Sequence, residues 1–469
     1  MKINERKLKN GQIKLTGYGA SAEVGRSAFV IEDDKRRVLI ECGLKIMPGD
    51  EPTLAPDGIK ERFHELDAVL LSHAHVDHSG YLPALWENGY FGKLYMTRPT
   101  LEIVQVLWLD HLKIEGNRHW STSGMHRAIS NTVTVDYHQE IEITEGISIK
   151  YINAGHILGS GMILIDWDGY KILFTGDIND KITPLFDGFE IPEGEIDVLI
   201  TESTNGCREV IERETINSEF IADVRRTLDL GNKVIIPCFA LGRSQELLTV
   251  LTEHIRDYPI YVDGMIKIMN QITEKYLSEK WVSNSLITRM KNEGIYSPFR
   301  YENVIEISKD NFENTHDFRK YLGKSKDPVI ILTTSGMMEP SPLHTHLRYA
   351  AKSNKNLITV VGYQAEGTRG RDLLNGAKSI PLSIDWNREE MVSINAKIKR
   401  FHYSGHTSVQ GIKNLAKTIN AKQIYMIHGD QKEQDDIREE LSNGVIPKTL
   451  MPKKSEVYLI EYILSKHLI

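Results

Sequence analysis

The segment His73-Ala74-His75-Val76-Asp77-His78 constrains the fold and the chemistry of this chain more than any other stretch. It follows the apolar run 68–71, which predicts a buried strand, and a helix is expected after it. Alternation along an extended loop places His73 and His75 on one side, while Asp77 and His78 enter the helix on another. One loop could thus serve two metal ions, and imidazole with carboxylate suits zinc. The alternative is a histidine-rich surface loop.

Four ligands from one loop cannot close two metal sites, so further ligands must come from elsewhere in the chain. His156 lies in the Gly-rich segment 154–161, where the backbone can approach an ion closely. Asp177 directly follows a predicted strand at 171–174, where a carboxylate can bridge two cations. Each is ordinary by itself, because a Gly-Asp pair after a strand is more often a turn than a ligand.

The order of predicted elements indicates two kinds of domain in a chain of 469 residues, which is too long for one ordinary core. Up to about residue 207, short apolar runs such as 37–40 and 162–165 indicate a sheet core with helices packed on it. From about 208, helix-then-strand units such as 216–230 and 233–237 are typical of a mostly parallel sheet. The pattern changes again near 396, so we expect an inserted domain that interrupts the first one.

Composition limits the function classes. Hydrophobic residues make up 41% and charged residues 26%, as in ordinary globular proteins. The net charge of −7 argues against a protein that coats nucleic acid nonspecifically, although a cleft with bound cations can be locally positive. No apolar run reaches the roughly 20 residues that cross a bilayer, and the start lacks a signal-peptide stretch, so we expect a cytoplasmic protein without membrane contact. The three cysteines form no CxxC pair, which disfavours a thiolate zinc site.

Further stretches match the pattern of one family of metal hydrolases: 23–28, 154–161, 174–177, 201–204, 237–243, 334–337, 366–371, 404–406 and 427–430. With the histidine loop, they make the chain resemble the β-CASP ribonuclease branch of the metallo-β-lactamase superfamily. That group includes the cleavage and polyadenylation specificity factor nuclease, its archaeal homologues and RNase J. The resemblance implies a metallo-β-lactamase αββα sandwich, residues 1–207 and 396–469, with an inserted α/β β-CASP domain at 208–395.

The resemblance also implies a complete ligand set for two Zn²⁺ ions. One ion would be held by His73, His75 and His156, the other by Asp77, His78 and His428, with Asp177 as the bridge. Asp77, Asp177, Glu202 and His406 are the implied catalytic residues.

Glu202 matches the acidic residue that orients a histidine, and His406 matches that histidine, which would protonate the leaving group. The alternative for His406 is a structural histidine. One departure concerns Glu41, where family members usually have Asp. We expect Glu41 to support the ligand histidines with slightly shifted geometry, or else to be a solvated charge at a strand end.

The expected function is hydrolysis of RNA phosphodiester bonds by a hydroxide that two metals activate, in an endonuclease or a 5′-to-3′ exonuclease. Single-stranded RNA is the expected partner, and a homodimer or an RNA-processing complex is possible. Two other readings are open: a catalytically silent scaffold subunit, and a hydrolase of small thioesters or lactams. We expect the phosphate contacts to come from Arg243, Ser335, Arg369 and Arg371, through guanidinium and backbone N–H groups. Other histidines are expected at exposed polar positions: His111, His119, His126, His344 and His346.

Overall fold

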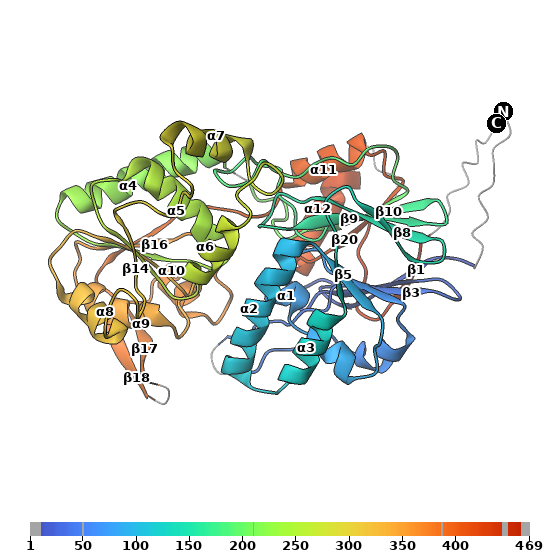
Figure 1. The fold of residues 1–469 in the computed structure, drawn as a ribbon, viewed down its shortest axis with the longest axis horizontal. Coiled ribbons are helices and arrows are strands. Elements are labelled where there is room, and N and C mark those ends of the chain that lie inside the picture. The colour runs from blue at the N-terminus through green and yellow to red at the C-terminus, as the bar shows by residue number, and fades with distance from the viewer. Residues whose placement is uncertain (1–10, 49–50, 210, 386–387, 443–448, 461–469) are drawn as a thin grey trace.

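A computed structural model describes residues 11–48, 51–209, 211–385, 388–442 and 449–460. The molecule has two lobes, which Figure 1 shows side by side: a two-sheet sandwich on the right, and on the left a parallel sheet wrapped by helices with a separate β-hairpin. The sandwich is built from both ends of the chain, and the other lobe is inserted between them. Among the described helices, none combines the length and the apolar character that crossing a membrane requires.

The first sheet of the sandwich mixes antiparallel and parallel pairs. Its strands are, in spatial order, β22 (Val457–Leu459), β1 (Lys14–Gly19), β2 (Ala28–Glu32), β3 (Arg37–Ile40), β4 (Ala68–Leu70), β5 (Lys93–Met96) and β6 (Thr132–Thr134). The strands from β3 to β6 run parallel, so the loop after β4 leaves from a carboxyl edge.

The second sheet lies face to face with the first. Its strands are, in spatial order, β21 (Thr449–Leu450), β20 (Gln423–Ile427), β11 (Val198–Glu202), β10 (Tyr170–Phe174), β9 (Gly161–Trp167), β8 (Ile147–Asn153) and β7 (Glu140–Thr144). The strands β10, β11, β20 and β21 are parallel, and the rest form an antiparallel meander.

Alternation along the strands produces the layers of the sandwich. In β3, Val38 and Ile40 belong to the apolar core between the sheets, whereas Leu39 belongs to the core under the outer helices. Phe29 and Phe174 meet between the sheets with ring centroids 6.0 Å apart. The first sheet is covered by α2 (Arg98–Glu115) and α3 (Thr122–Ser130), and the second by α11 (Val409–Thr418) and α12 (Gln431–Ser442). The expected αββα sandwich is confirmed.

The inserted lobe contains a six-stranded parallel sheet. Its strands are, in spatial order, β14 (Val304–Glu306), β13 (Ile260–Asp263), β15 (Ile330–Thr333), β12 (Val234–Pro237), β16 (Leu357–Val360) and β19 (Lys397–Arg400). The central strands are buried along their whole length, which explains their unbroken apolar sequence. The surrounding elements are α4 (Arg213–Asp229), α5 (Arg243–His254), α6 (Ile266–Glu274), α7 (Asn284–Glu293), α8 (Thr315–Lys324), α9 (Pro342–Ala350), α10 (Arg369–Leu374) and the hairpin β17 (Ser379–Asp385) and β18 (Arg388–Ser393).

Strand β19 lies beyond one expected domain boundary. The sequence pattern placed the end of the insertion at residue 395, but β19 pairs with β16 and is the edge strand of the inserted sheet. By sheet membership residues 397–400 extend the inserted sheet past residue 395, and the domain boundary at 395 stays a prediction. An edge strand rich in Lys and Arg lacks the apolar run that marked the other strands, so its membership was not visible in the sequence.

The two lobes share one continuous apolar cluster, which extends from the inner face of α2 to α5 and α6. The contact also has polar bonds, since Tyr276 Oη donates to Glu102 Oε1 over 2.6 Å and Lys275 Nζ donates to Glu102 Oε2 over 2.8 Å. Burial of apolar surface across the junction holds the inserted lobe against the sandwich.

Three histidines that were expected to be exposed are buried. His346 is fully buried and contacts Asp263 Oδ2 over 2.9 Å. His344 donates from Nε2 to the Met338 carbonyl over 2.9 Å, and His111 stacks on Trp120 with ring centroids 5.2 Å apart. Buried polar groups are tolerated where they have partners, and the Asp263 partner of His346 lies 83 positions away in the sequence.

Candidate metal centre

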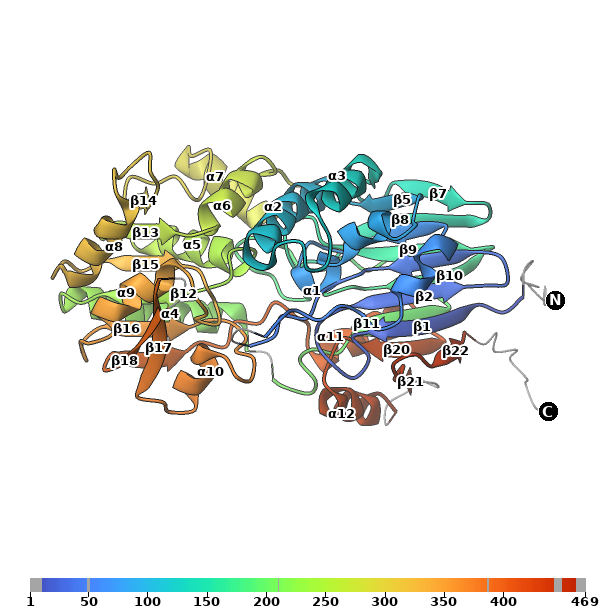
Figure 2. The same cartoon turned by 90° about the horizontal axis from the view of Figure 1, so that it is seen from below.

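The predicted metal ligands come from loops at one end of the sandwich. The histidine loop follows β4 and leads into α1 (Val76–Ser79), and His156 lies in the turn between β8 and β9. Asp177 and His428 follow the carboxyl ends of the parallel strands β10 and β20. Figure 2 shows α1 at the end of the sandwich that faces the inserted lobe. Parallel strands present their carboxyl-end loops at the same edge, which gathers these residues from distant parts of the chain.

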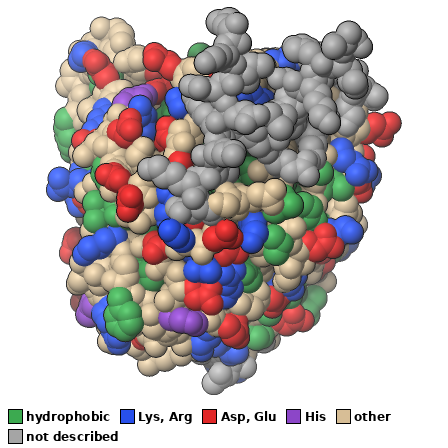
Figure 3. Space-filling model, turned by 90° about the vertical axis from the view of Figure 1, so that its right-hand side faces the viewer, with side chains coloured by type: hydrophobic (Ala, Val, Ile, Leu, Met, Phe, Trp, Pro, Cys, Tyr) green, Lys and Arg blue, Asp and Glu red, His purple; other side chains and the backbone are tan. Residues whose placement is uncertain are grey.

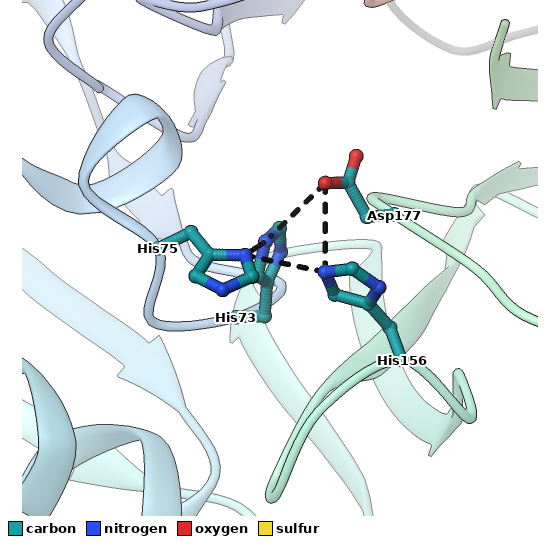
Figure 4. A group of neighbouring side chains, drawn as sticks. All are labelled: His73, His75, His156 and Asp177. Carbon is teal, nitrogen blue, oxygen red and sulfur yellow. Dashed lines mark hydrogen bonds and ion pairs between the residues drawn. The ribbon is translucent and has the colours of Figure 1, made fainter. Parts of the chain in front are cut away.

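A first cluster consists of His73, His75, His156 and Asp177, whose ligand atoms all lie within 4.8 Å of one another. His75 Nδ1 is 3.1 Å from His73 Nε2 and 3.2 Å from His156 Nε2. Asp177 Oδ2 is 3.6 Å from His73 Nε2 and 3.7 Å from His156 Nε2. Figure 4 shows the four side chains turned toward a common point.

Burial keeps the imidazoles of this cluster neutral. It lowers the pKa of His75 to about 4, against the opposing charges of Asp77 and Asp177. It also holds the pKa of His73 and of His156 well below the ordinary value. Neutral imidazole is the form that coordinates a metal ion.

A second cluster contains Asp77, His78 and His428. Asp77 Oδ2 is 3.3 Å from His428 Nε2 and 3.7 Å from His78 Nε2. Asp177 also faces this cluster, because its Oδ2 is 3.3 Å from His78 Nε2 and its Oδ1 is 3.3 Å from His428 Nδ1. Asp177 therefore lies between the two clusters, which is the placement that a bridging carboxylate needs.

The donor atoms of both clusters fit divalent cations. His78 Nε2 and Asp177 Oδ1 are buried without a hydrogen-bond partner among the described residues. A buried polar atom without a partner costs about 1 to 3 kcal/mol, so such atoms converging at one place point to a ligand that satisfies them. Imidazole nitrogen and carboxylate oxygen are the donors preferred by zinc.

Glu202 and His406 form a close pair beside the first cluster. His406 Nδ1 lies 2.9 Å from Glu202 Oε2, and the other carboxylate oxygen of Glu202 accepts a hydrogen bond from Ile178 N–H over 2.7 Å. Burial opposes a charge on His406, but Glu202 and Asp177 raise the pKa of His406 to about 9. His406 Nε2 has no hydrogen bond within the described chain and can exchange a proton.

Glu41 lies behind the ligand histidines and is fully buried. Ser27 Oγ donates to Glu41 Oε2 over 2.5 Å, and Ser72 Oγ donates to Oε1. Glu41 Oε2 is 2.8 Å from His78 Nδ1, while Ser72 Oγ is 3.0 Å from His73 Nδ1. One carboxylate thus reaches a histidine of each cluster, so the structure places Glu41 beside the ligands and not in solvent.

Two of the expected phosphate contacts are engaged inside the inserted lobe. Arg243 is 10% exposed and forms an ion pair with Glu246. Arg369 is 11% exposed, pairs with Glu339 and Glu389, and donates from Nε to the Pro381 carbonyl over 2.8 Å. Neither guanidinium is free to turn outward without breaking these contacts.

The other two expected phosphate contacts are less firmly engaged. Ser335 follows β15, and its hydroxyl accepts a hydrogen bond from Glu339 N–H over 3.2 Å. Arg371 is 28% exposed, and its ion-pair partner Glu366 is itself 80% exposed. An exposed ion pair is weak and can be exchanged for a phosphate.

Sequence reasoning missed residues that support the loop 403–407. The Asn205 amide donates to Ser404 Oγ over 2.9 Å and to the His406 carbonyl over 2.9 Å. Arg213 Nη2 donates to the Ser404 carbonyl. For Asn205 the only signal was its position next to the stretch 201–204. Arg213 had none.

Three family descriptions match separate parts of the chain. Residues 30–204 match a metallo-beta-lactamase superfamily domain, residues 244–373 a Beta-Casp domain, and residues 391–450 a Zn-dependent metallo-hydrolase RNA specificity domain. Together they span both lobes.

Similar proteins cover nearly the whole chain. An "RNase J-like protein" of Methanocaldococcus jannaschii is 33% identical over 427 residues, which are 89% of this chain and 93% of that protein. A "Transcription termination factor FttA" of Methanothermobacter thermautotrophicus is 32% identical over 473 residues, 97% of this chain and 73% of that protein. A solved structure of a protein of unknown function from Enterococcus faecalis has the same fold, with a TM-score of 0.57 at 13% identity, and covers 96% of this chain and 100% of that one.

Proposed function

This chain belongs to the β-CASP branch of the metallo-β-lactamase superfamily, and on that premise we propose that it is a zinc-dependent ribonuclease. It would hydrolyse phosphodiester bonds of single-stranded RNA at the metal centre, where the two lobes meet. The observation that carries the proposal is the Glu202–His406 pair beside two complete clusters of metal-binding side chains. The names of the relatives and the RNA specificity description of residues 391–450 support RNA as the substrate.

Seven side chains would hold two metal ions. When bound, the ions would lower the pKa of an attacking water toward neutrality and offset charge on the nonbridging phosphate oxygens. The residues involved are His73, His75 and His156 for one ion, Asp77, His78 and His428 for the other, and Asp177 between them.

His406 would supply the proton that the leaving oxygen needs. Its Nδ1 faces Glu202, so the proton given to the leaving sugar oxygen would come from Nε2 as the P–O bond breaks. Glu202 is 1% exposed and accepts the Ile178 N–H bond on its second oxygen, so it is held firmly in place. Its role is to orient the imidazole and to stabilise its protonated form.

RNA would be bound locally, at the metal centre and the neighbouring edge of the inserted sheet. Figure 3 shows the end of the sandwich that faces away from the inserted lobe, where basic and acidic side chains are interspersed over the described surface. A mixed surface on a chain of net charge −7 does not attract a polyanion by itself. Ser335 and Arg371 are the proposed phosphate contacts, because Ser335 has no ion pair to give up and Arg371 is more exposed than Arg243 and Arg369.

The test is cleavage of end-labelled single-stranded RNA by the full chain after chelation and reloading with zinc. We expect wild type to cut and the Asp177→Asn variant to lose activity, because the bridging position loses its charge. Equal cutting by this variant would contradict the two-metal proposal. A 5′-monophosphorylated RNA labelled at either end separates internal cutting from 5′-to-3′ trimming, since trimming releases single nucleotides from the 5′ end only.

The scaffold and the small-molecule readings have less support. A silent scaffold has no need to keep both clusters complete, and a thioester or lactam hydrolase has no need of the Glu202–His406 pair or the inserted lobe. Hydrolysis of a small thioester without cleavage of RNA by the zinc-loaded protein would favour the small-molecule reading.

A further inference from the structure

The loop 403–407 links the edge strand β19 of the inserted lobe to α11 of the sandwich. It carries His406, and its Gly405 carbonyl accepts a hydrogen bond from His156 Nδ1 over 2.7 Å. That bond leaves His156 Nε2 to face the first cluster. The positions of a predicted metal ligand and of the predicted proton donor therefore both depend on one short loop.

Two arginines and one glutamate of the inserted lobe lie buried behind this loop. Arg213 and Arg243 are the first residues of α4 and α5, and Glu246 lies one turn into α5. Glu246 Oε1 is 3.0 Å from Arg213 Nε, and Glu246 Oε2 pairs with Arg243 Nη1. The three side chains are only 9%, 10% and 7% exposed. Two guanidinium groups thus share a single carboxylate away from solvent.

Both guanidinium groups also contact the ring of Tyr403. The Cζ atoms of Arg213 and Arg243 lie 5.2 Å and 5.3 Å from the ring centroid, within the range of a cation–π interaction. The Tyr403 hydroxyl donates to Asn217 Oδ1 over 2.9 Å, and Arg213 Nη2 donates to the Ser404 carbonyl. The ring and the next peptide group are therefore held from several directions.

The contact between the loop and His156 leaves little room for a side chain at residue 405. A Cβ placed on Gly405 would lie 3.2 Å from His156 Cε1 and 3.6 Å from Arg243 Nη2. The backbone must therefore approach the imidazole closely, and a small shift of the loop would move the carbonyl that orients it.

Buried ion pairs often contribute no more stability than well-packed apolar groups of similar volume would, so stability is a weak explanation for this cluster. We propose that Arg213, Arg243, Glu246 and Tyr403, here named the arginine clamp, set the position of Gly405 and thereby the orientation of His156 and His406. The clamp consists of positioning residues. The inserted lobe thus helps to build the metal centre, in addition to any contact it makes with RNA.

The test measures zinc binding by the full chain without RNA, in competition with a chromophoric chelator. The variants keep the charge of the clamp and change only its shape: Arg213→Lys loses the planar guanidinium, and Tyr403→Leu loses the ring face. Loss of a group that orients a metal ligand typically weakens metal binding 10-fold to 100-fold. We expect at least a 10-fold loss for one of two zinc ions in both variants. Tyr403→Phe, which keeps the ring, should stay within about twofold of wild type.

A matched control lies on the same helix. Arg225 pairs with Asp257 Oδ2 over 2.6 Å, and its Cζ lies 5.9 Å from the ring centroid of Tyr258. Arg225→Lys disturbs a similar arginine–tyrosine contact without touching the loop, so we expect its zinc affinity to match wild type. If Tyr403→Leu does not fold, as judged by its thermal unfolding, Arg213→Lys decides the question.

Two outcomes would overturn the clamp. Either both variants bind two zinc ions as tightly as wild type, or they bind zinc normally and only the KM for RNA rises, which would make these residues substrate contacts. The measurement of the KM for RNA rests on the proposed function, but the measurement of zinc affinity does not. Wild type that binds two zinc ions and cuts no RNA would refute the ribonuclease while leaving the clamp supported by its zinc measurements.

Discussion

Glu41→Gln is the substitution from which most can be learned, because Glu41 reaches one histidine of each metal cluster. Ser72 Oγ donates to Glu41 Oε1, so the His73 Nδ1 proton points to Ser72 and leaves His73 Nε2 for a metal. Glu41 Oε2, 2.8 Å from His78 Nδ1, favours the proton on that nitrogen and leaves His78 Nε2 free. The carboxylate thereby favours the binding tautomer of both ligands.

Glutamine cannot serve both histidines at once. With its amide nitrogen at the Oε1 position, Ser72 accepts from it and the Ser72 hydroxyl proton loses its acceptor; the nearest replacement is His73 Nδ1, which favours the histidine proton on the metal-binding nitrogen. With the amide nitrogen at the Oε2 position, it faces the Nδ1 proton of His78 and displaces that proton in the same way. In either orientation one ligand histidine is held in the wrong tautomer.

The expected loss is 10-fold to 100-fold in the affinity for one metal ion. This corresponds to about 1.4 to 2.8 kcal/mol, at roughly 1.4 kcal/mol for each factor of ten. Competition titration with a chromophoric chelator should show one weakened site and one near-normal site. Glu41→Asp keeps the charge, and we expect it to lose less than Glu41→Gln.

The matched control is Glu87→Gln. Glu87 Oε1 accepts from Ser121 N–H and from Gly124 N–H, each over 3.0 Å, and the carbonyl oxygen of Gln can keep both bonds. We expect normal zinc binding in this variant. Glu41→Gln with two sites of wild-type affinity would refute the tautomer argument, and so would an Asp variant that is worse than the Gln variant.

Three further predictions concern catalysis and stability. His406→Asn should slow RNA cleavage by about 10² to 10⁴ in single-turnover assays while zinc affinity stays normal, because only the proton donor is lost; unchanged cleavage would remove His406 from the mechanism. Asp263→Asn should cost about 3 to 5 kcal/mol of unfolding free energy at pH 7 by urea denaturation, because the fully buried Asp263 is the ion-pair partner of Arg319. Burial opposes the charged form of Asp263, but Arg319 holds the pKa of Asp263 below its ordinary value. The charged Asp263 therefore stabilises the fold above about pH 4, and this stabilisation is lost as the pH falls further. The difference in unfolding free energy between wild type and Asp263→Asn should therefore shrink in acid. Phe174→Ala should cost about 3 to 5 kcal/mol by the same assay, because the ring is fully buried between the sheets, and a loss below 1 kcal/mol would contradict that packing.

The layered fold was predictable because it rests on local patterns. The apolar run 37–40 coincides with β3, and the run 162–165 lies within β9. The pairing of β19 with the inserted sheet was not predictable, since lysine and arginine on an exposed edge carry no apolar signal. The buried His344 and His346 were misjudged for a related reason, because only the folded chain brings the Ser383 N–H group to His344 and Asp263 to His346.

The sequence by itself determined which groups could bind metal and where the strands that carry them lie, because ligand chemistry and strand periodicity are local properties of the chain. Only the tertiary structure decided how those groups meet. It brought His428 from beyond the insertion to Asp177 and placed Glu41 between two histidines. It turned Arg243, expected at a phosphate, inward onto Glu246. The meeting of His428 and Asp177 depends on which loops leave the same edge of packed sheets, and residues more than two hundred positions apart reveal that neighbourhood only after folding.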